Sequence, residues 1–397
     1  MRLFLFFSTM VLFASAVTHS IDDSSTLVSE LVNWVQSEEG FVNDKIQIRR
    51  VDPADPNSYF GVFANADIDA HEVLMEIPQS CYIEIFDVAK DEYVVQDSAE
   101  DSMAAYHSNI CNLSHRLMEE MELGNGSEYA PYIAYLKAQK PGQLPVSWSQ
   151  SGKDLLRQVL RPGHDGVDWI DMYFLQNNST NQKDACITND PFEINMLELT
   201  VQRSYDAALI PIWDMLNHHN GHYNAEQITS IYDEVGTIVH ASKAIFSGEE
   251  ILASYDKCFD CGDDAMEQGT PEILKNFGFV EGYPHRWVFN GDDGKFDGLE
   301  DLWFEVHSDG TDERWIEWWF NETTGVYDGI QNNAQMLYLQ RELQRLDEVG
   351  RKFNLTSCSY EGYVPFKEWQ MISEYYHAAK DAMMLATGNV SMVKICS

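Results

Sequence analysis

The pattern of hydrophobic and polar positions predicts an opening helix over residues 26–38, where Leu27, Leu31, Val32 and Val35 recur at helical spacing. Residues 46–48 then alternate, and a turn-rich stretch follows at 52–58. Residues 60–68 and 73–77 have the composition of short strands on either side of a turn. The chain is therefore expected to continue from this helix into a small β hairpin or meander.

Longer periodic segments predict helices at 113–123, 131–137, 153–160 and 193–208, with polar loops between them. A second β region is expected at 237–241 and 250–255, and two further helices at 332–353 and 365–387. This order predicts an α+β fold, in which a helical insertion separates two β regions and a mainly helical part ends the chain.

The N-terminus has the arrangement of a secretory signal peptide: Arg2, the apolar residues 3–12, and Ala14-Ser15-Ala16 before a cut. We assign residues 1–16 to this leader, and nothing after residue 25 is apolar for long enough to form a transmembrane segment. The expected location is the secretory pathway, in the endoplasmic reticulum lumen or outside the cell, with a plastid as the alternative. Glycosylation is also expected, because seven sequons occur, at Asn112, Asn125, Asn177, Asn178, Asn321, Asn354 and Asn389.

The charge excludes one class of partner. The chain has 64 acidic against 26 basic residues, a net charge of −38, and such a surface repels nucleic acid. With 44% hydrophobic residues the chain is nonetheless expected to fold. An acidic surface suits a basic protein substrate by steering, although it also serves solubility, and we expect a monomer.

Common cofactor and metal signatures are absent from the sequence. It contains no GxGxxG, GxxxxGK[ST], HExxH or GxSxG pattern. His218, His219 and His222 lack a carboxylate or cysteine at ligand spacing, so no metal site is expected. Cys258 and Cys261 form a single CxxC, which fits a local disulfide or two ordinary thiols better than zinc.

Several segments, in order, resemble SET-domain methyltransferases of the plant Rubisco large-subunit lysine methyltransferase type, which include the actin histidine methyltransferase. The matching segments are 59–68 (YFGVFANADI) with 72–78 (EVLMEIP), 128–133 (EYAPYI), 210–218 (IPIWDMLNH), 248–255 (GEEILASY) and the trailing 276–280 (NFGFV). The resemblance covers residues 26–283 and implies a SET domain of short strands, interrupted by helices at about 106–200. Residues 284–397 would form a helical region like the family's substrate-binding part.

The resemblance implies transfer of a methyl group from S-adenosylmethionine to a lysine side chain of a protein, with histidine as the less favoured acceptor. The family has glycine where this chain has Tyr59, and only the second glycine, Gly61, is kept. Glycine is used where a backbone approaches a ligand closely. A catalytically inactive binding module with a SET fold is therefore the alternative.

The same resemblance assigns site residues. Tyr255 would be the catalytic tyrosine beside the transferred methyl group, and Arg203 would pair with the cofactor carboxylate, which its forked guanidinium matches. The full set is Ser58, Tyr59, Phe60, Arg203, Asn217, His218 and Tyr255 for the cofactor, and Tyr205, Asp214 and Phe277 for the substrate. Without the resemblance, Tyr255 would be taken as a core tyrosine, Asn217 and His218 as a polar turn, and Arg203 as an exposed helix residue.

Overall fold

A computed structural model describes most of the chain. The described residues are 23–55, 58–87, 92–93, 102–140, 144–160, 187–205, 208–231, 233–255, 269–289, 302–310, 313–318, 320–321, 326–327, 329–330, 333–355, 360 and 362–388. The leader at 1–16, the Cys258/Cys261 pair and the sequons at Asn177, Asn178 and Asn389 lie outside them.

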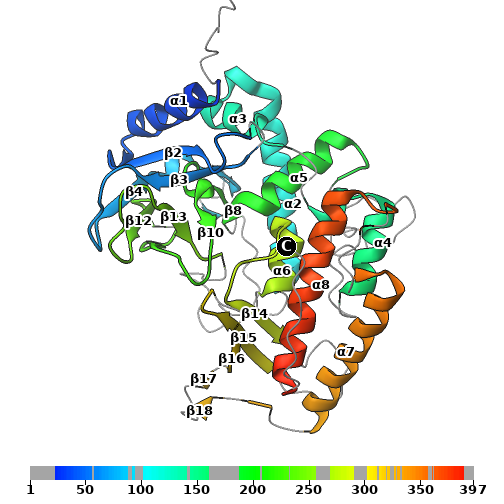
Figure 1. Cartoon of the computed structure of the whole chain (residues 1–397). Coiled ribbons are helices and arrows are strands. Elements are labelled where there is room, and N and C mark those ends of the chain that lie inside the picture. The colour runs from blue at the N-terminus through cyan, green and yellow to red at the C-terminus, as the bar shows by residue number, and fades with distance from the viewer. Residues whose placement is uncertain are drawn as a thin grey trace, which may run out of the picture.

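Strands from both expected β regions combine into two four-stranded sheets beneath helix α1(Asp23–Ser37) (Figure 1). Leu31 and Val35 of α1 are fully buried in their core, so hydrophobic burial fixes this helix. The sheets have the strand orders β1-β4-β12-β11 and β10-β13-β3-β2. Their strands are β1(Phe41–Val42), β2(Ile46–Arg50), β3(Phe60–Ala64), β4(Val73–Ile77), β10(Asn217–His218), β11(Ala225–Gln227), β12(Thr237–Ala241) and β13(Glu250–Ala253).

Helices α2(Ser102–Leu123), α3(Ala130–Lys137) and α5(Pro191–Arg203) lie between these strands in the sequence. Smaller strand pairs accompany them: β5(Ile83–Glu84), β6(Phe86–Asp87), β7(Glu92–Tyr93), β8(Ser204–Tyr205) and β9(Ala208–Leu209). The helix expected at 193–208 is wrong at its end, because the chain leaves α5 at Arg203 and Ser204 is extended. Residues 204–205 pair instead with β9, which also pairs with β5, so sheet contacts far along the chain end the helix.

The C-terminal part has its own hydrophobic cluster, under helices α7(Asn333–Lys352) and α8(Phe366–Ala386). These confirm the two helices expected at 332–353 and 365–387. Helix α4(Gln150–Val159) packs into this cluster, although it comes from the insertion (Figure 1). The sequence did not predict the strands here: the sheet β14(His285–Phe289), β15(Leu302–Ser308) and β16(Arg314–Trp318), and the pair β17(Phe320–Asn321) and β18(Val326–Tyr327).

The pairing of β13 with β10 and β3 brings distant segments together. Strand β10 runs parallel to β13, with Asn217 opposite Leu252 and His218 opposite Ala253. Strand β13 is also antiparallel to β3, with Ile251 opposite Val62. The segments around residues 60, 217 and 255 therefore meet at one place. No helix in the described part of the chain is long and apolar enough to span a membrane.

Candidate active site

A buried ion pair lies at the end of α5. Arg203 Nη1 is 2.9 Å from Asp214 Oδ2, and the two side chains are 15% and 0% exposed. The guanidinium also donates to the Tyr135 hydroxyl, on α3, and to Gln139 Oε1, two residues after that helix, both at 3.0 Å. Burial opposes the charge of Arg203, but Tyr135 and Asp214 outweigh it and raise the pKa of this guanidinium, so it stays a cation.

Two atoms of this pair lack partners. Among the described residues, neither Arg203 Nε nor Asp214 Oδ1 has a hydrogen-bond partner, although both atoms are buried. Asp214 Oδ2 accepts from Tyr132 at 3.1 Å as well as from Arg203. Burial raises the pKa of Asp214, and Arg203 opposes that rise. The pair thus has one unsatisfied cationic N–H and one unsatisfied carboxylate oxygen, which costs free energy unless a ligand satisfies them.

Tyr255 is a half-buried residue two positions after the end of β13. Its hydroxyl donates to the carbonyl oxygen of Leu216 at 2.8 Å. Burial is the largest cause that raises its pKa, so the phenol stays protonated at neutral pH. Its ring centroid lies 4.6 Å from that of Phe277 and 5.0 Å from that of His218. The hydroxyl therefore lies among aromatic rings and main-chain oxygen.

The segment at 58–61 is bound within the chain. The carbonyl oxygens of Ser58, Tyr59 and Phe60 accept from Arg50 Nη1, from the Val51 amide at 3.0 Å and from Asn217 Nδ2 at 3.2 Å, respectively. The Tyr59 side chain is 57% exposed, so it does not fill the interior at this position. Burial and the nearby Glu250 carboxylate raise the pKa of Tyr59.

Gly61 and Asn217 lie in direct contact. Asn217 Nδ2 donates to Glu250 Oε1 at 2.7 Å. A Cβ atom on Gly61 would lie 2.5 Å from that same oxygen and 2.8 Å from Asn217 Nδ2. A side chain at residue 61 would therefore displace the tips of these two side chains, and glycine fits their close approach.

The aromatic residues assigned to the substrate lie in two groups. The Tyr205 ring packs edge-on against Trp213 at 5.2 Å, at the end of the Arg203 segment. Phe277, at the end of α6(Thr270–Phe277), packs on Tyr255. Asp214 lies between these groups in the sequence and is joined to Arg203 in space.

Glu281 is a site residue that the sequence reasoning missed. His218 Nε2 lies 2.9 Å from Glu281 Oε2, and both side chains are fully buried. The His218 side chain is thus engaged within the chain, which leaves only its backbone for a ligand. Glu281 directly follows the matched segment 276–280, so its place next to a family motif was the available signal.

The other two histidines do not join His218. His219 Nδ1 accepts from the amides of Gly221 and His222, and its ring lies 4.5 Å from that of His222. The described part of the chain contains no group of three His, Cys, Asp or Glu residues arranged to hold a metal.

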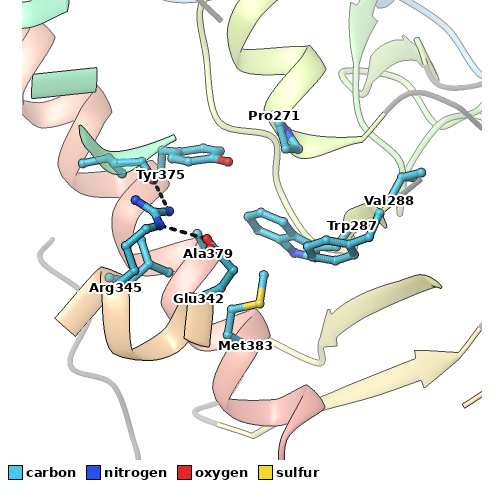
Figure 2. A pocket seen from close by; sticks show the side chains of 11 residues that line it. Pro271, Trp287, Val288, Glu342, Arg345, Tyr375, Ala379 and Met383 are labelled. Atoms are coloured by element: carbon cyan, nitrogen blue, oxygen red, sulfur yellow. Dashed lines mark hydrogen bonds and ion pairs between the residues drawn. The ribbon is translucent and has the colours of Figure 1, made fainter. Parts of the chain in front are cut away.

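A cavity lies away from these residues, in the C-terminal cluster (Figure 2). Its empty volume is about 320 Å³, counted to its open mouth, and its walls include Trp287, Tyr375 and Met383. Arg345 at its edge is bound to Glu342 and to the carbonyl oxygens of Gln158 and Val159, which end α4. This cavity belongs to the packing of α4, α7 and α8 rather than to the Tyr255 site.

Comparison with known proteins identifies the fold. Solved structures of Rubisco LSMT share the fold at 12% sequence identity: the form bound to AdoMet has a TM-score of 0.51 and covers 91% of each chain. The form bound to sinefungin and monomethyllysine has a TM-score of 0.50 and covers 91% of this chain and 90% of that one. No curated protein matches the sequence. The SET domain model matches residues 59–256, which contain Gly61, Arg203, Asn217 and Tyr255, and the chain is a member of the SET-domain family.

Proposed function

We propose that this chain is an S-adenosylmethionine-dependent methyltransferase that modifies a lysine side chain of a protein. The observation that carries the proposal is the pair of unsatisfied atoms on one buried ion pair, Arg203 Nε and Asp214 Oδ1. A cationic N–H and a carboxylate oxygen are complementary to the α-carboxylate and α-ammonium groups of the methionine half of this cofactor. The Rubisco LSMT structures contain AdoMet in the same fold, which supports the assignment.

The residues present fit the cofactor. Arg203 and Asp214 would bind its amino-acid half, and the backbone of residues 58–60 and 217–218 would hold the rest. When bound, the cofactor supplies an electrophilic methyl group. The Tyr59 side chain is 57% exposed, so it does not fill the interior beside Gly61, which agrees with a functional site.

Tyr255 is the residue we assign to catalysis. Its hydroxyl is fixed by the Leu216 carbonyl, and its ring is fixed by Phe277 and His218. A lysine amine attacks only when neutral, and burial among aromatic rings lowers the pKa of an amine through desolvation. Phe277 has no hydroxyl to hold the amine, so Tyr255 is the tyrosine we assign to align it.

The first experiment measures binding of S-adenosylhomocysteine and transfer of a labelled methyl group into a protein extract, followed by hydrolysis of the product to amino acids. Methyl-lysine is the expected product, and methyl-histidine would instead support the second acceptor. Absence of cofactor binding by the wild-type chain would refute the proposal and favour the inactive binding module.

The Tyr255→Phe variant tests the catalytic assignment. It should lower kcat by about 10²-fold or more while changing cofactor affinity by much less, because the hydroxyl acts on the reacting groups. Tyr82→Phe is the matched control, since Tyr82 is a buried tyrosine of the same core whose hydroxyl bonds Ile77 and Thr237. Equal losses of kcat and affinity in Tyr255→Phe would exclude the catalytic role.

We also propose that the protein follows the secretory route and meets a basic protein partner there. Cys111 is disulfide-bonded, as expected in an oxidising compartment, and the sequon residues Asn112 and Asn125 are exposed. Expression of the full chain in eukaryotic cells, with enzymatic removal of N-glycans, tests this. A mass decrease after treatment is expected, and an unglycosylated protein that is imported by plastids would favour the alternative.

A further inference from the structure

Glu281 lies where three elements meet beside Tyr255. Its carboxylate accepts from His218 Nε2 at 2.9 Å and from Asn220 Nδ2 at 2.7 Å, both in the segment that begins with β10. It also accepts from Thr270 Oγ1 at 2.5 Å, at the start of α6, and from the Arg286 amide at 3.3 Å, on β14. One carboxylate thus joins the SET core to the region that follows it.

The hydrogen bonds fix the protonation of His218. The amide of Tyr255 donates to His218 Nδ1 at 2.9 Å, so Nδ1 carries no proton. The ring proton of the neutral imidazole therefore lies on Nε2, where it faces Glu281. A continuous chain of hydrogen bonds runs from Glu281 through His218 to the backbone of Tyr255.

This series of hydrogen bonds also reaches Asn217, which is assigned to the cofactor. His218 follows Asn217, and both pair with β13 in parallel register, two residues before Tyr255. A shift of the His218 ring would move the Asn217 backbone and the Tyr255 backbone together, because strand pairing couples them.

We propose that Glu281 is a positioning residue, whose ionised carboxylate accepts from the Nε2–H of His218, holds that ring in place and thereby sets the backbone of Asn217 and Tyr255 for cofactor binding. The inference rests on the proposed function. It assigns no contact between Glu281 and the substrate or cofactor.

The surroundings of Glu281 make this arrangement sensitive to pH. Burial raises the pKa of Glu281 to about 7. The groups that face it are His218 from β10, Thr270 from α6, Arg286 and His285 from β14, and Glu305 from β15, which pairs with Arg286. Burial lowers the pKa of His285 to about 4, so that ring stays neutral near pH 7. Protonation of Glu281 would point an O–H at groups that themselves donate.

The test is calorimetric titration of the full chain with S-adenosylhomocysteine between pH 6 and 8. Since about one-tenth of a group with a pKa of about 7 is ionised at pH 6, wild-type affinity should be about tenfold weaker at pH 6 than at pH 8. Glu281→Gln should bind about tenfold or more weakly at pH 8 and lose this pH dependence, because the amide cannot accept from all the donors. Equal affinity and an equal pH profile in wild type and Glu281→Gln would overturn the proposal.

Glu342→Gln is the matched control, because Glu342 is a buried carboxylate ion-paired with Arg345 in the C-terminal cluster. It should leave the affinity and its pH profile unchanged. A loss equal to that of Glu281→Gln would show general destabilisation and overturn the positioning role.

A second measurement is independent of ligand binding. The ¹⁵N shifts of the His218 ring in the free, folded protein report which nitrogen is protonated. Both proteins should keep the Nε2–H form, because the Tyr255 amide donates to Nδ1. The Nε2 shift should change with pH near 7 in wild type, as the facing carboxylate of Glu281 gains a proton, and should stay constant in Glu281→Gln. An equal pH response of this shift in both proteins would overturn the proposal. Absence of ligand binding by wild type refutes the proposed function alone, since the ring shifts still decide whether Glu281 sets the state of His218.

Discussion

Replacing Arg203 by Met separates the structural role of the buried ion pair from its role toward a ligand. Met keeps much of the side-chain length but removes the cation. Asp214 would remain fully buried without its charge partner, with one hydrogen bond left, from Tyr132. Breaking a buried pair in this way costs about 3–5 kcal/mol of folding free energy.

The pH dependence of the folding stability of Arg203→Met follows from the titration of Asp214. Burial already raises its pKa above the ordinary value of 3.8, and loss of Arg203 raises the pKa further. At pH values between the ordinary pKa and this raised one, the folded variant holds a proton that the unfolded chain releases. The stability of the variant therefore falls as pH rises from the lower to the higher of these two values. The deficit of Arg203→Met relative to wild type should therefore be larger at pH 8 than at pH 5.

Arg314→Met provides the matched control. Arg314 Nη1 lies 2.6 Å from Asp381 Oδ2 in the C-terminal part, and their side chains are 11% and 7% exposed. Burial likewise raises the pKa of Asp381. Denaturant unfolding should show a comparable loss and a comparable pH trend in both variants.

The two variants should differ in ligand recognition. S-adenosylhomocysteine carries the amino-acid group, and methylthioadenosine lacks it. A charge-assisted bond is worth about 1.5–3 kcal/mol, so Arg203 should favour the first ligand by about 10- to 100-fold. Calorimetry should show that preference in wild type and Arg314→Met but not in Arg203→Met. If Arg203→Met keeps the full preference, Arg203 does not bind the ligand carboxylate, and the fit argued from its unsatisfied Nε is wrong.

Three further changes test the geometry. Gly61→Ala places Cβ 2.5 Å from Glu250 Oε1. It should lower the unfolding free energy by about 1–3 kcal/mol and weaken the binding of S-adenosylhomocysteine. Unchanged denaturation and calorimetry would mean that the Asn217–Glu250 contact relaxes freely. Burial raises the pKa of Glu281 to about 7 in the folded chain, against an ordinary value of 4.5, so its ionisation costs stability as pH rises between these values. The stability of wild type relative to Glu281→Gln should fall by about 1.4 kcal/mol per pH unit there, and a flat difference in urea unfolding would contradict the raised pKa. Ser149 accepts from the Gly152 amide at the start of α4 and donates to Glu368 of α8. Ser149→Ala should therefore lower the unfolding free energy in urea by about 1 kcal/mol, with no effect on ligand binding. Altered ligand binding would show that α4 and α8 are coupled to the site.

Local patterns were sufficient to predict the elements whose ends are marked by short-range signals. The expected strands at 73–77 and 237–241 match β4 and β12 at both ends, and the last two helices match α7 and α8 within about one residue. The three-stranded sheet β14-β15-β16 was not predicted, although its strands pair with their neighbours in the chain and β15 alternates buried and half-buried positions. The early end of α5 has a different cause, since residues 204–205 pair with β9, which is itself paired with the distant β5.

The site shows the same division between local and distant information. Motif resemblance assigned Arg203, Asn217 and Tyr255 to the site. The structure brings the segments of Asn217 and Tyr255 together through β10 and β13 and joins Arg203 to Asp214. Their partners were not predicted: Tyr135 comes from α3, Gln139 lies two residues after that helix, and Glu281 lies 63 positions after His218. A motif identifies a residue that faces a site, whereas the group that fixes its orientation depends on which elements pack there.

Three carboxylates near Tyr255, two with fully buried side chains and one half-buried, divide into two chemical roles. Burial raises the pKa of Asp214, Glu250 and Glu281, a shift that often marks acid or base catalysis. Glu250 and Glu281 are directed at donors within the chain, Asn217 for the first and His218 with Asn220 for the second, so their charge organises backbone segments. Asp214 alone among them has a buried oxygen without a partner in the described residues. Because attack by a neutral amine on a methyl group requires alignment more than proton transfer, this distribution favours two carboxylates that shape the site and one that binds a ligand.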